Sequence, residues 1–166
     1  MMDNMMIALP LLILFLPLVS FIILIFFGKK LPRQGDWIAV GSIVTTFFFA
    51  LYLFIQMILA YDPGFSHGAS FSWIDLDAFK IELGILVDNL TIIMLLIVTL
   101  VSSCTHIFSL EYMKDDIRYN RYYAYLGLFT FSMNGIVLAD NLISMYMSWE
   151  LVGVSSYLLI GHWFEK

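Results

Sequence analysis

The protein is a chain of 166 residues, of which 61% are hydrophobic and only 13% are charged. Soluble domains average about 45–50% apolar and about 25% charged residues. The composition therefore excludes an ordinary soluble globule, a disordered tail and a nucleic-acid-binding domain, and it predicts an integral membrane protein. The net charge of −5 says less than the positions of Lys and Arg, which set membrane orientation. The single cysteine, Cys104, excludes an intrachain disulfide.

Five apolar stretches approach or exceed the roughly 20 residues that a helix needs to cross the hydrocarbon core. They cover residues 5–27, 37–61, 89–110, 122–139 and 141–164. The first is too long for the apolar part of a signal peptide and has no basic residue before it, so we interpret it as a mature helix. We expect an all-α integral membrane protein with about five transmembrane helices.

The basic residues predict the orientation of these spans. Seven of the eight lie in the loops 28–36 and 111–121 or at the chain end, and only Lys80 lies on the other side. Because Lys- and Arg-rich short loops stay in the cytoplasm, we expect the N-terminus outside and the end of the chain in the cytoplasm. An aromatic belt is expected at the same interface, formed by Trp37, Trp163, Tyr112, Tyr119, Tyr122 and Tyr123.

The longest loop, residues 62–83, falls between the second and third spans on the predicted outer side. Phe79, Ile81 and Leu83 alternate with Lys80 and Glu82, which is the period of a half-buried strand. An Asp-rich centre supplies a turn. We expect a short outer β-hairpin at about residues 70–84, and the alternative is an irregular loop on the lipid headgroups.

Glu150 is the most informative residue. It follows Asn141 by nine positions, which places it about 13–14 Å into the fifth span. A charge there costs about 2.5–3.5 kcal/mol on insertion scales, so such acids usually face a protein interior or a hydrated path. We interpret Glu150 as an intramembrane proton-binding site. The alternative is a protonated acid that bonds another helix without functional consequence.

The remaining polar residues carry weaker signals. His106 lies four residues from the end of the third span, where it serves either as a proton relay or as a side chain that snorkels or bonds a backbone carbonyl. His67 and His162 lie in or near loops, and no histidine pair has metal-ligand spacing. The fourth span carries polar groups of the kind that bond neighbouring helices, namely Thr130, Ser132 and Asn134. Without a Cys cluster or a phosphate loop, we expect no redox chemistry, cofactor or metal in this chain.

Several motifs of the fourth and fifth spans are recognisable. They are the runs 121–126 with Phe129, 131–133, 137–142, 149–153 and 156–161. Together they resemble the start of the antiporter-like subunit L of proton-pumping NADH:quinone oxidoreductase (respiratory complex I), called chain 5 in mitochondria. Leu31-Pro32 after the first span and the run 87–90 before the third support the match. The resemblance covers nearly the whole chain but only the beginning of the family, whose members have well over a dozen helices.

The resemblance implies a role for two residues. Glu150 matches the family's essential glutamate, which is thought to work with a lysine on a later helix, and His106 matches a histidine often present on the third helix. Residues 1–121 correspond to the N-terminal helices with the hairpin, and residues 122–166 to the start of the antiporter-like proton-channel unit. Asn134 and His162 depart from the family pattern. Because the lysine-bearing helices are missing, we expect a truncated, fragmentary or split subunit that translocates no protons alone.

The resemblance also implies the setting. The chain is expected to be a membrane subunit of a redox-driven proton translocase in the bacterial cytoplasmic membrane, in contact with lipid and with other complex I membrane subunits. NADH and quinone would be used by those other subunits, and no nucleic acid is expected to bind. Two alternatives are a subunit of a multi-subunit Na+/H+ antiporter or membrane-bound hydrogenase, and a scaffolding helix bundle.

Overall fold

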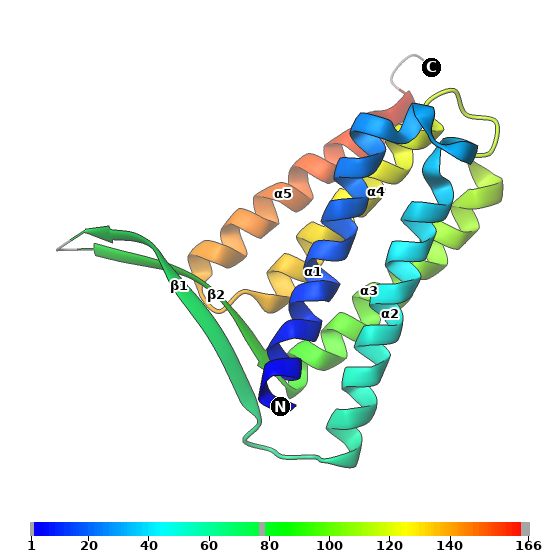
Figure 1. The fold of residues 1–166 in the computed structure, drawn as a ribbon. Helices are drawn as coiled ribbons and strands as arrows, with labels where there is room; N and C mark the ends of the chain where they lie inside the picture. The colour runs from blue at the N-terminus through cyan, green and yellow to red at the C-terminus, as the bar shows by residue number, and fades with distance from the viewer. Residues whose placement is uncertain (1, 77–78, 164–166) are drawn as a thin grey trace.

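The computed structural model describes residues 2–76 and 79–163, which form a helix bundle with one β-hairpin (Figure 1). The helices are α1 (Met2–Phe27), α2 (Asp36–Leu59), α3 (Asn89–Tyr112), α4 (Tyr119–Leu138) and α5 (Leu142–Ile160). Three short 3-10 turns, η1 (Gly28–Lys30), η2 (Pro32–Gly35) and η3 (Gly161–Trp163), lie at one end of the bundle. The strands are β1 (Ser66–Leu76) and β2 (Phe79–Asp88).

The predicted helical membrane fold is confirmed in its main features. Four helices, α1, α2, α3 and α5, are long and apolar enough to cross a membrane. The helix α4 is less apolar, but it contacts the other four helices and buries side chains along most of its length. A helix surrounded by protein needs fewer apolar residues than one that faces lipid. That α4 is a fifth span stays a prediction, as does the orientation.

The β-hairpin extends beyond the predicted residues 70–84. Its antiparallel register runs from Ser66 opposite Asp88 to Leu76 opposite Phe79, with an irregularity between Ser72 and Ile74. The turn predicted at the Asp-rich centre falls on residues 77–78, outside the described residues. The alternative of an irregular loop is wrong. Figure 1 shows the hairpin reaching sideways from the bundle, past the beginning of α5.

The hairpin is fixed to the beginning of α5 by Asn141. Its Oδ1 accepts a hydrogen bond from the Ser144 amide at 2.9 Å, which caps the helix, and its Nδ2 donates to the Glu82 carbonyl at 2.9 Å. Ile85 forms an isolated β-bridge with Ala139 beside it. A Cβ atom at Gly84 would collide with the neighbouring side chains. This part of β2 therefore lies directly against the α4–α5 turn.

The contact between α1 and α4 is built around a proline. Pro17 has no amide hydrogen, so the Ile13 carbonyl one turn earlier lacks its helical donor. Asn134 on α4 donates to that carbonyl at 3.3 Å, and Asn134 is fully buried. Gly127 lets the helices approach, because a Cβ there would lie 3.2 Å from the Pro17 carbonyl oxygen. The predicted interhelical role of Asn134 is confirmed.

The other two predicted interhelical side chains behave differently from each other. Thr130 bonds Ser102 on α3 with 2.6 Å between the hydroxyl oxygens, as predicted. Ser132 instead donates to the Leu128 carbonyl of its own helix at 2.7 Å. A hydroxyl that bonds the preceding turn is satisfied without a neighbour, so the prediction is wrong for Ser132.

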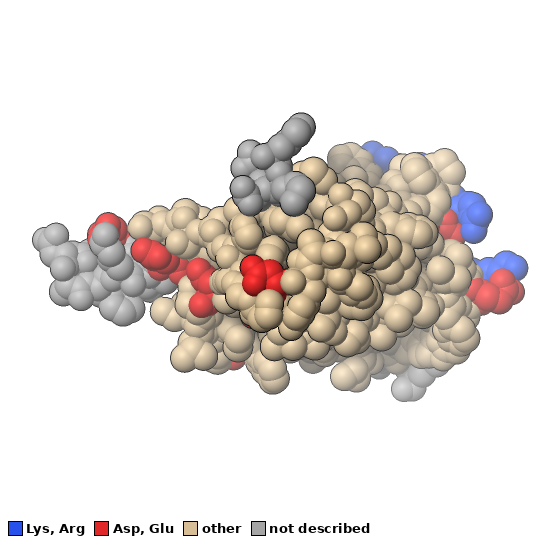
Figure 2. All heavy atoms as spheres, turned by 90° about the horizontal axis from the view of Figure 1, so that it is seen from below, with Lys and Arg blue, Asp and Glu red and all other residues tan. Residues whose placement is uncertain are grey.

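Most of the described cations gather at one end of the bundle, where Asp36, Glu111, Asp115 and Asp116 also lie, whereas Lys80 lies in β2. The end formed by η1, η2, the α3–α4 loop and η3, called the basic end below, holds these described cations: Lys29, Lys30, Arg33, Lys114, Arg118 and Arg121. The opposite end, called the hairpin end, holds these described acids: Asp62, Asp75, Glu82, Asp88 and Asp140. Figure 2 views the molecule from the hairpin end and shows acidic atoms in front, with the basic atoms farther back.

The predicted aromatic belt is only partly outside the bundle. Trp37, Trp163 and Tyr112 are exposed, but Tyr119 and Tyr123 are buried in a core cluster. The Tyr119 hydroxyl donates to the Asp36 carboxylate at 3.2 Å, and the Tyr123 hydroxyl donates to the His106 carbonyl at 3.0 Å. Because polar partners inside the bundle satisfy both hydroxyls, these two tyrosines form core contacts, and their assignment to the belt is wrong.

The turn between α1 and α2 holds consecutive residues in the left-handed region. Arg33 and Gln34 have φ near 53° and 55°, and Gly35 has φ of 80°. The Arg33 guanidinium pairs with the Asp36 carboxylate at 3.0 Å. The Gln34 side-chain oxygen accepts a hydrogen bond from the Asn120 backbone N–H at 3.3 Å. These contacts offset the cost of the unusual backbone. At Gly35 a Cβ would also lie 2.5 Å from Leu24.

Replacing Gly35 by alanine should destabilise the fold. The left-handed backbone and the collision with Leu24 should together cost at least about 1 kcal/mol. The measurement is the midpoint of thermal unfolding of the protein in detergent. The control is Gly41→Ala on α2, where a Cβ meets no atom within 4 Å and helix propensity favours alanine by up to about 1 kcal/mol. Equal midpoints for the two variants would contradict the prediction.

Candidate functional site

Glu150 lies on the outer face of α5. The helix packs mainly against α4, and only one of its described side chains, Ser155, is fully buried. The side chains of Tyr146, Val154 and Tyr157, which share a face with Glu150 at helical spacing, are exposed. Gly153 also faces open space, since a Cβ there meets no atom within 4 Å. This open surface is called the Glu150 face.

The prediction that Glu150 faces a protein interior or a hydrated path stays a prediction, because the described chain covers only one side of α5. The acid is exposed on the surface of the five-helix bundle, and its described neighbour is the Tyr146 side chain one turn earlier. A carboxyl at mid-bilayer depth cannot face hydrocarbon without a large cost. The Glu150 face is therefore a surface that further protein or a hydrated path must cover in the membrane.

His106 is fully buried where α3 meets α4. Its Nδ1 lies 2.8 Å from the Ser102 carbonyl oxygen, so Nδ1 carries the hydrogen and Nε2 is the basic nitrogen. Among the described atoms, Nε2 has no hydrogen-bond partner. The snorkelling alternative is wrong, and the alternative of a bonded backbone carbonyl is correct for Nδ1. An unpartnered buried nitrogen is expensive, which marks His106 as a functional candidate.

The two predicted site residues do not form one site here. His106 is buried between α3 and α4, whereas Glu150 lies on the exposed side of α5. Among the residues that the structure describes, no three His, Cys, Asp or Glu side chains gather in an arrangement that suits a metal ion. The chemistry available to the described chain is thus proton binding at separate carboxyl and imidazole groups.

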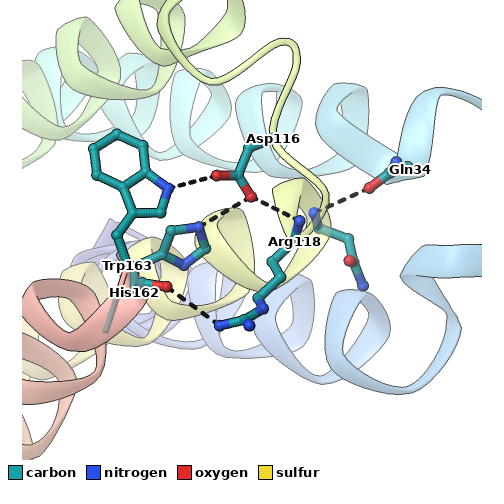
Figure 3. A network of polar contacts seen from close by, with 6 residues as sticks. Gln34, Asp116, Arg118, His162 and Trp163 are labelled. Carbon is teal, nitrogen blue, oxygen red and sulfur yellow. Dashed lines mark hydrogen bonds and ion pairs between the residues drawn. The ribbon is translucent and has the colours of Figure 1, made fainter. Parts of the chain in front are cut away.

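A third polar site, which sequence reasoning missed, joins the α3–α4 loop to the end of α5 (Figure 3). The Asp116 carboxylate accepts hydrogen bonds from the Trp163 indole at 2.6 Å, the His162 imidazole at 3.2 Å and the Arg118 amide at 2.6 Å. The Arg118 guanidinium donates to the His162 carbonyl at 3.5 Å. We call these four residues the Asp116 cluster. The one sequence feature that could have indicated this cluster is His162, which departs from the family pattern.

The Asp116 carboxylate is held in its charged form. Burial pushes the pKa of Asp116 upward, but the hydrogen bonds from Trp163, Arg118 and His162 favour the carboxylate and leave the pKa below its ordinary value. The side chains of Asp116 and His162 are only 14% and 6% exposed. The cluster therefore fixes the end of α5 against the loop, on the same helix that carries Glu150.

The lowered pKa predicts an acid-dependent loss of stability. The stabilisation that ionised Asp116 adds to the free energy of unfolding is complete above its unfolded-state pKa of about 4. It is lost as the pH falls through the lower pKa that Asp116 has in the folded state. Asp116→Asn should lower the free energy of unfolding by about 1 kcal/mol at pH 7 and should flatten the pH dependence below pH 4. The measurement is the thermal midpoint against pH. Asp115→Asn, at an exposed neighbour, is the control and should follow the wild type.

Two family models match the chain. One, described as the N-terminus of chain 5 of NADH-ubiquinone oxidoreductase (complex I), matches residues 73–123. The other, described as the transmembrane domain of NADH:quinone oxidoreductase and the Mrp antiporter, matches residues 139–166 and so includes Glu150. The two matches cover the end of β1, all of β2 and α3, the start of α4, and α5.

Curated relatives carry the same description. NADH-ubiquinone oxidoreductase chain 5 of Dictyostelium discoideum is 39% identical over 154 residues, which are 92% of this chain and 23% of the relative. NADH-quinone oxidoreductase subunit L of Rickettsia bellii is 38% identical over 163 residues, which are 96% of this chain and 25% of the relative. The resemblance to the chain 5 and subunit L family is confirmed. The chain spans about a quarter of the length of these relatives.

A solved structure supports the fold independently of close sequence similarity. An archaeal respiratory membrane complex, the membrane-bound sulfane sulfur reductase, contains a chain that matches with a TM-score of 0.70 at 14% identity. The match covers 89% of this chain and 29% of that one. The fold of this chain therefore resembles part of a chain in that respiratory membrane complex.

Proposed function

We propose that this chain is the N-terminal part of a proton-translocating membrane subunit of NADH:quinone oxidoreductase, in which Glu150 binds and releases a proton within the membrane. The observation that supports the proposal is the position of Glu150 on an open face of α5, halfway along an apolar helix long enough to cross a membrane. Gly153 and the exposed Tyr146 leave room on that face for water or for another helix.

A second group must complete the site. The described Lys and Arg residues lie at the basic end, except Lys80 in β2, and none lies within α5, so no described helix places a cation opposite Glu150. The Glu150 face therefore suits a protonatable or cationic side chain from protein beyond the described residues. NADH and quinone would react in other subunits, and the energy would reach Glu150 through contacts with membrane subunits. The relatives come from a bacterium and from eukaryotes, so the membrane is either bacterial or mitochondrial.

Glu150→Gln should stop proton translocation without preventing assembly. Glutamine keeps the size and the hydrogen-bonding capacity of a protonated glutamic acid but cannot release a proton. In the assembled complex in membrane vesicles, we expect proton uptake per NADH oxidised to fall at least about tenfold. The control is Glu111→Gln, an exposed acid in the α3–α4 region, which should pump like the wild type. Proton uptake at the wild-type ratio would remove the role of Glu150.

We also propose that His106 relays protons inside the bundle. The proposal is supported by its unpartnered Nε2 and by the adjacent hydroxyls, since Ser102 bonds Thr130 and lies 3.4 Å from Nδ1. An imidazole that gives hydrogen to a carbonyl through one nitrogen accepts a proton at the other.

His106→Asn separates this relay role from a structural one. Asparagine retains a donor for the Ser102 carbonyl but cannot carry a proton. A relay predicts that the assembled variant pumps several-fold more slowly, measured as the initial rate of vesicle acidification. The same variant with an unchanged rate and an unchanged thermal midpoint would leave His106 a structural role only.

The second candidate function is a subunit of a multi-subunit Na+/H+ antiporter. The model that matches residues 139–166 is described for both kinds of complex, so this observation favours neither. Purification of the intact complex from its membrane separates them. NADH oxidation that copurifies with the chain supports the oxidoreductase, whereas Na+-driven proton exchange without NADH oxidation supports the antiporter.

A further inference from the structure

A cavity of about 240 Å³ opens between α4 and α5 at the basic end. From the α4 side it is lined by Arg118, Arg121 and Tyr125, and from the α5 side by Tyr157, Leu158 and His162. Tyr157 also lies at the end of the Glu150 face, and the other lining residues lie outside that face. The cavity lies beside the Asp116 cluster, and Figure 3 shows the Arg118 side chain extending toward the His162 carbonyl.

The chemistry of the lining changes with depth along both helices. The arginines lie at the very start of α4 and His162 follows the end of α5, so the charged and polar groups lie at the basic end. One turn farther along each helix, about 6 Å at 1.5 Å per residue, the lining becomes Tyr125 on α4 and Leu158 on α5. A phospholipid has the same order, with an anionic headgroup, an interfacial layer and apolar chains.

Of the cavity's two arginines, Arg121 is the one without an anionic partner among the described residues. The start of a helix carries a partial positive charge, so cations there are unfavourable unless an anion joins them. The Asp116 carboxylate accepts the Arg118 amide hydrogen at this helix start, and no described anion pairs with Arg121. Arg121 lies in the first turn of α4 and is exposed. Within the described part of the chain, its guanidinium has neither a hydrogen-bond nor an ion-pair partner. A planar guanidinium binds phosphate oxygens through paired hydrogen bonds.

We propose that this cavity binds the phosphate group of an anionic phospholipid in the leaflet at the basic end. Arg121, together with the wall formed by Arg118, contacts the phosphate oxygens. Tyr157 and Leu158 contact the beginning of an acyl chain. Basic pockets between membrane helices bind such headgroups, and each basic residue near the surface contributes about fivefold in affinity. The inference requires only that α4 and α5 lie in a membrane, so it is independent of proton translocation.

The test counts lipids on the intact complex that contains this chain. The complex is extracted with mild detergent from its own membrane, and native mass spectrometry measures the anionic phospholipid that remains bound. Arg121→Gln should reduce retention at least about fivefold, and Arg121→Lys, which keeps the charge, should lose less. The matched control is Lys114→Gln, a cation of the α3–α4 loop at the same end of the bundle that pairs with Glu111 outside the cavity; it should retain lipid like the wild type.

Three results would overturn the proposal. Wild-type retention in Arg121→Gln would show that the cavity holds no such lipid. Equal loss in Lys114→Gln would show diffuse attraction to the basic end without a site. If millimolar inorganic phosphate displaces the bound species and no lipid mass is released, the cavity binds free phosphate. The masses of the assembled variants show in the same spectra that each complex is intact, which excludes misfolding as the cause of lipid loss.

Discussion

In a bilayer, each polar group that leaves water must find a partner within the protein. That constraint explains the arrangement of α4, the least apolar helix of the bundle. Its Asn134 supplies the hydrogen that Pro17 withholds from the Ile13 carbonyl, and its Thr130 bonds Ser102 on α3. Asn134 and Thr130 of α4 therefore pair with polar groups that α1 and α3 present to them. Glu150 differs from these residues, since its described neighbour is a tyrosine of its own helix.

The helix α5 is held at its ends more than along its length. Asn141 ties its first turn to the β-hairpin, and the Asp116 cluster ties its last turn to the α3–α4 loop. Between these points one side of the helix packs on α4 and the other is open. A helix that is attached at both ends cannot rotate freely about its own axis. They thus determine which side Glu150 presents, even though few of the helix's own side chains are buried.

Much of this fold was predictable from local sequence. The lengths of the apolar stretches predicted the bounds of α1, α2 and α3 to within a few residues. The alternation of apolar and charged residues at 79–83 indicated a strand. The first half of β1 was not predictable, because His67, Gly68 and Ser70 favour no strand by themselves. These residues become a strand through pairing with β2, which in turn bonds Ala139.

The Asp116 cluster was missed for a different reason. Asp116 and His162 are 46 positions apart, and neither has a local pattern that predicts the other. Only the packing of α4 between α3 and α5 brings the loop to the end of the chain's last helix. Similarly, the position of Glu150 halfway along α5 followed from residue spacing, but the side of the helix on which it lies did not. Which side of α5 is covered depends on where α4 lies, and that is a property of the tertiary fold.

The two open surfaces of α5 differ in what can cover them. At the basic end, cations lie within reach of water and headgroups, so a mobile anion from the membrane can neutralise them at little cost. Halfway along the helix no such anion, cation or headgroup is available, and a carboxyl that meets hydrocarbon there would destabilise insertion by several kcal/mol. The Glu150 face thus requires ordered protein or protein-bound water, while the cavity between α4 and α5 requires only lipid. The same helix therefore meets protein on one side and the lipid headgroup layer on another.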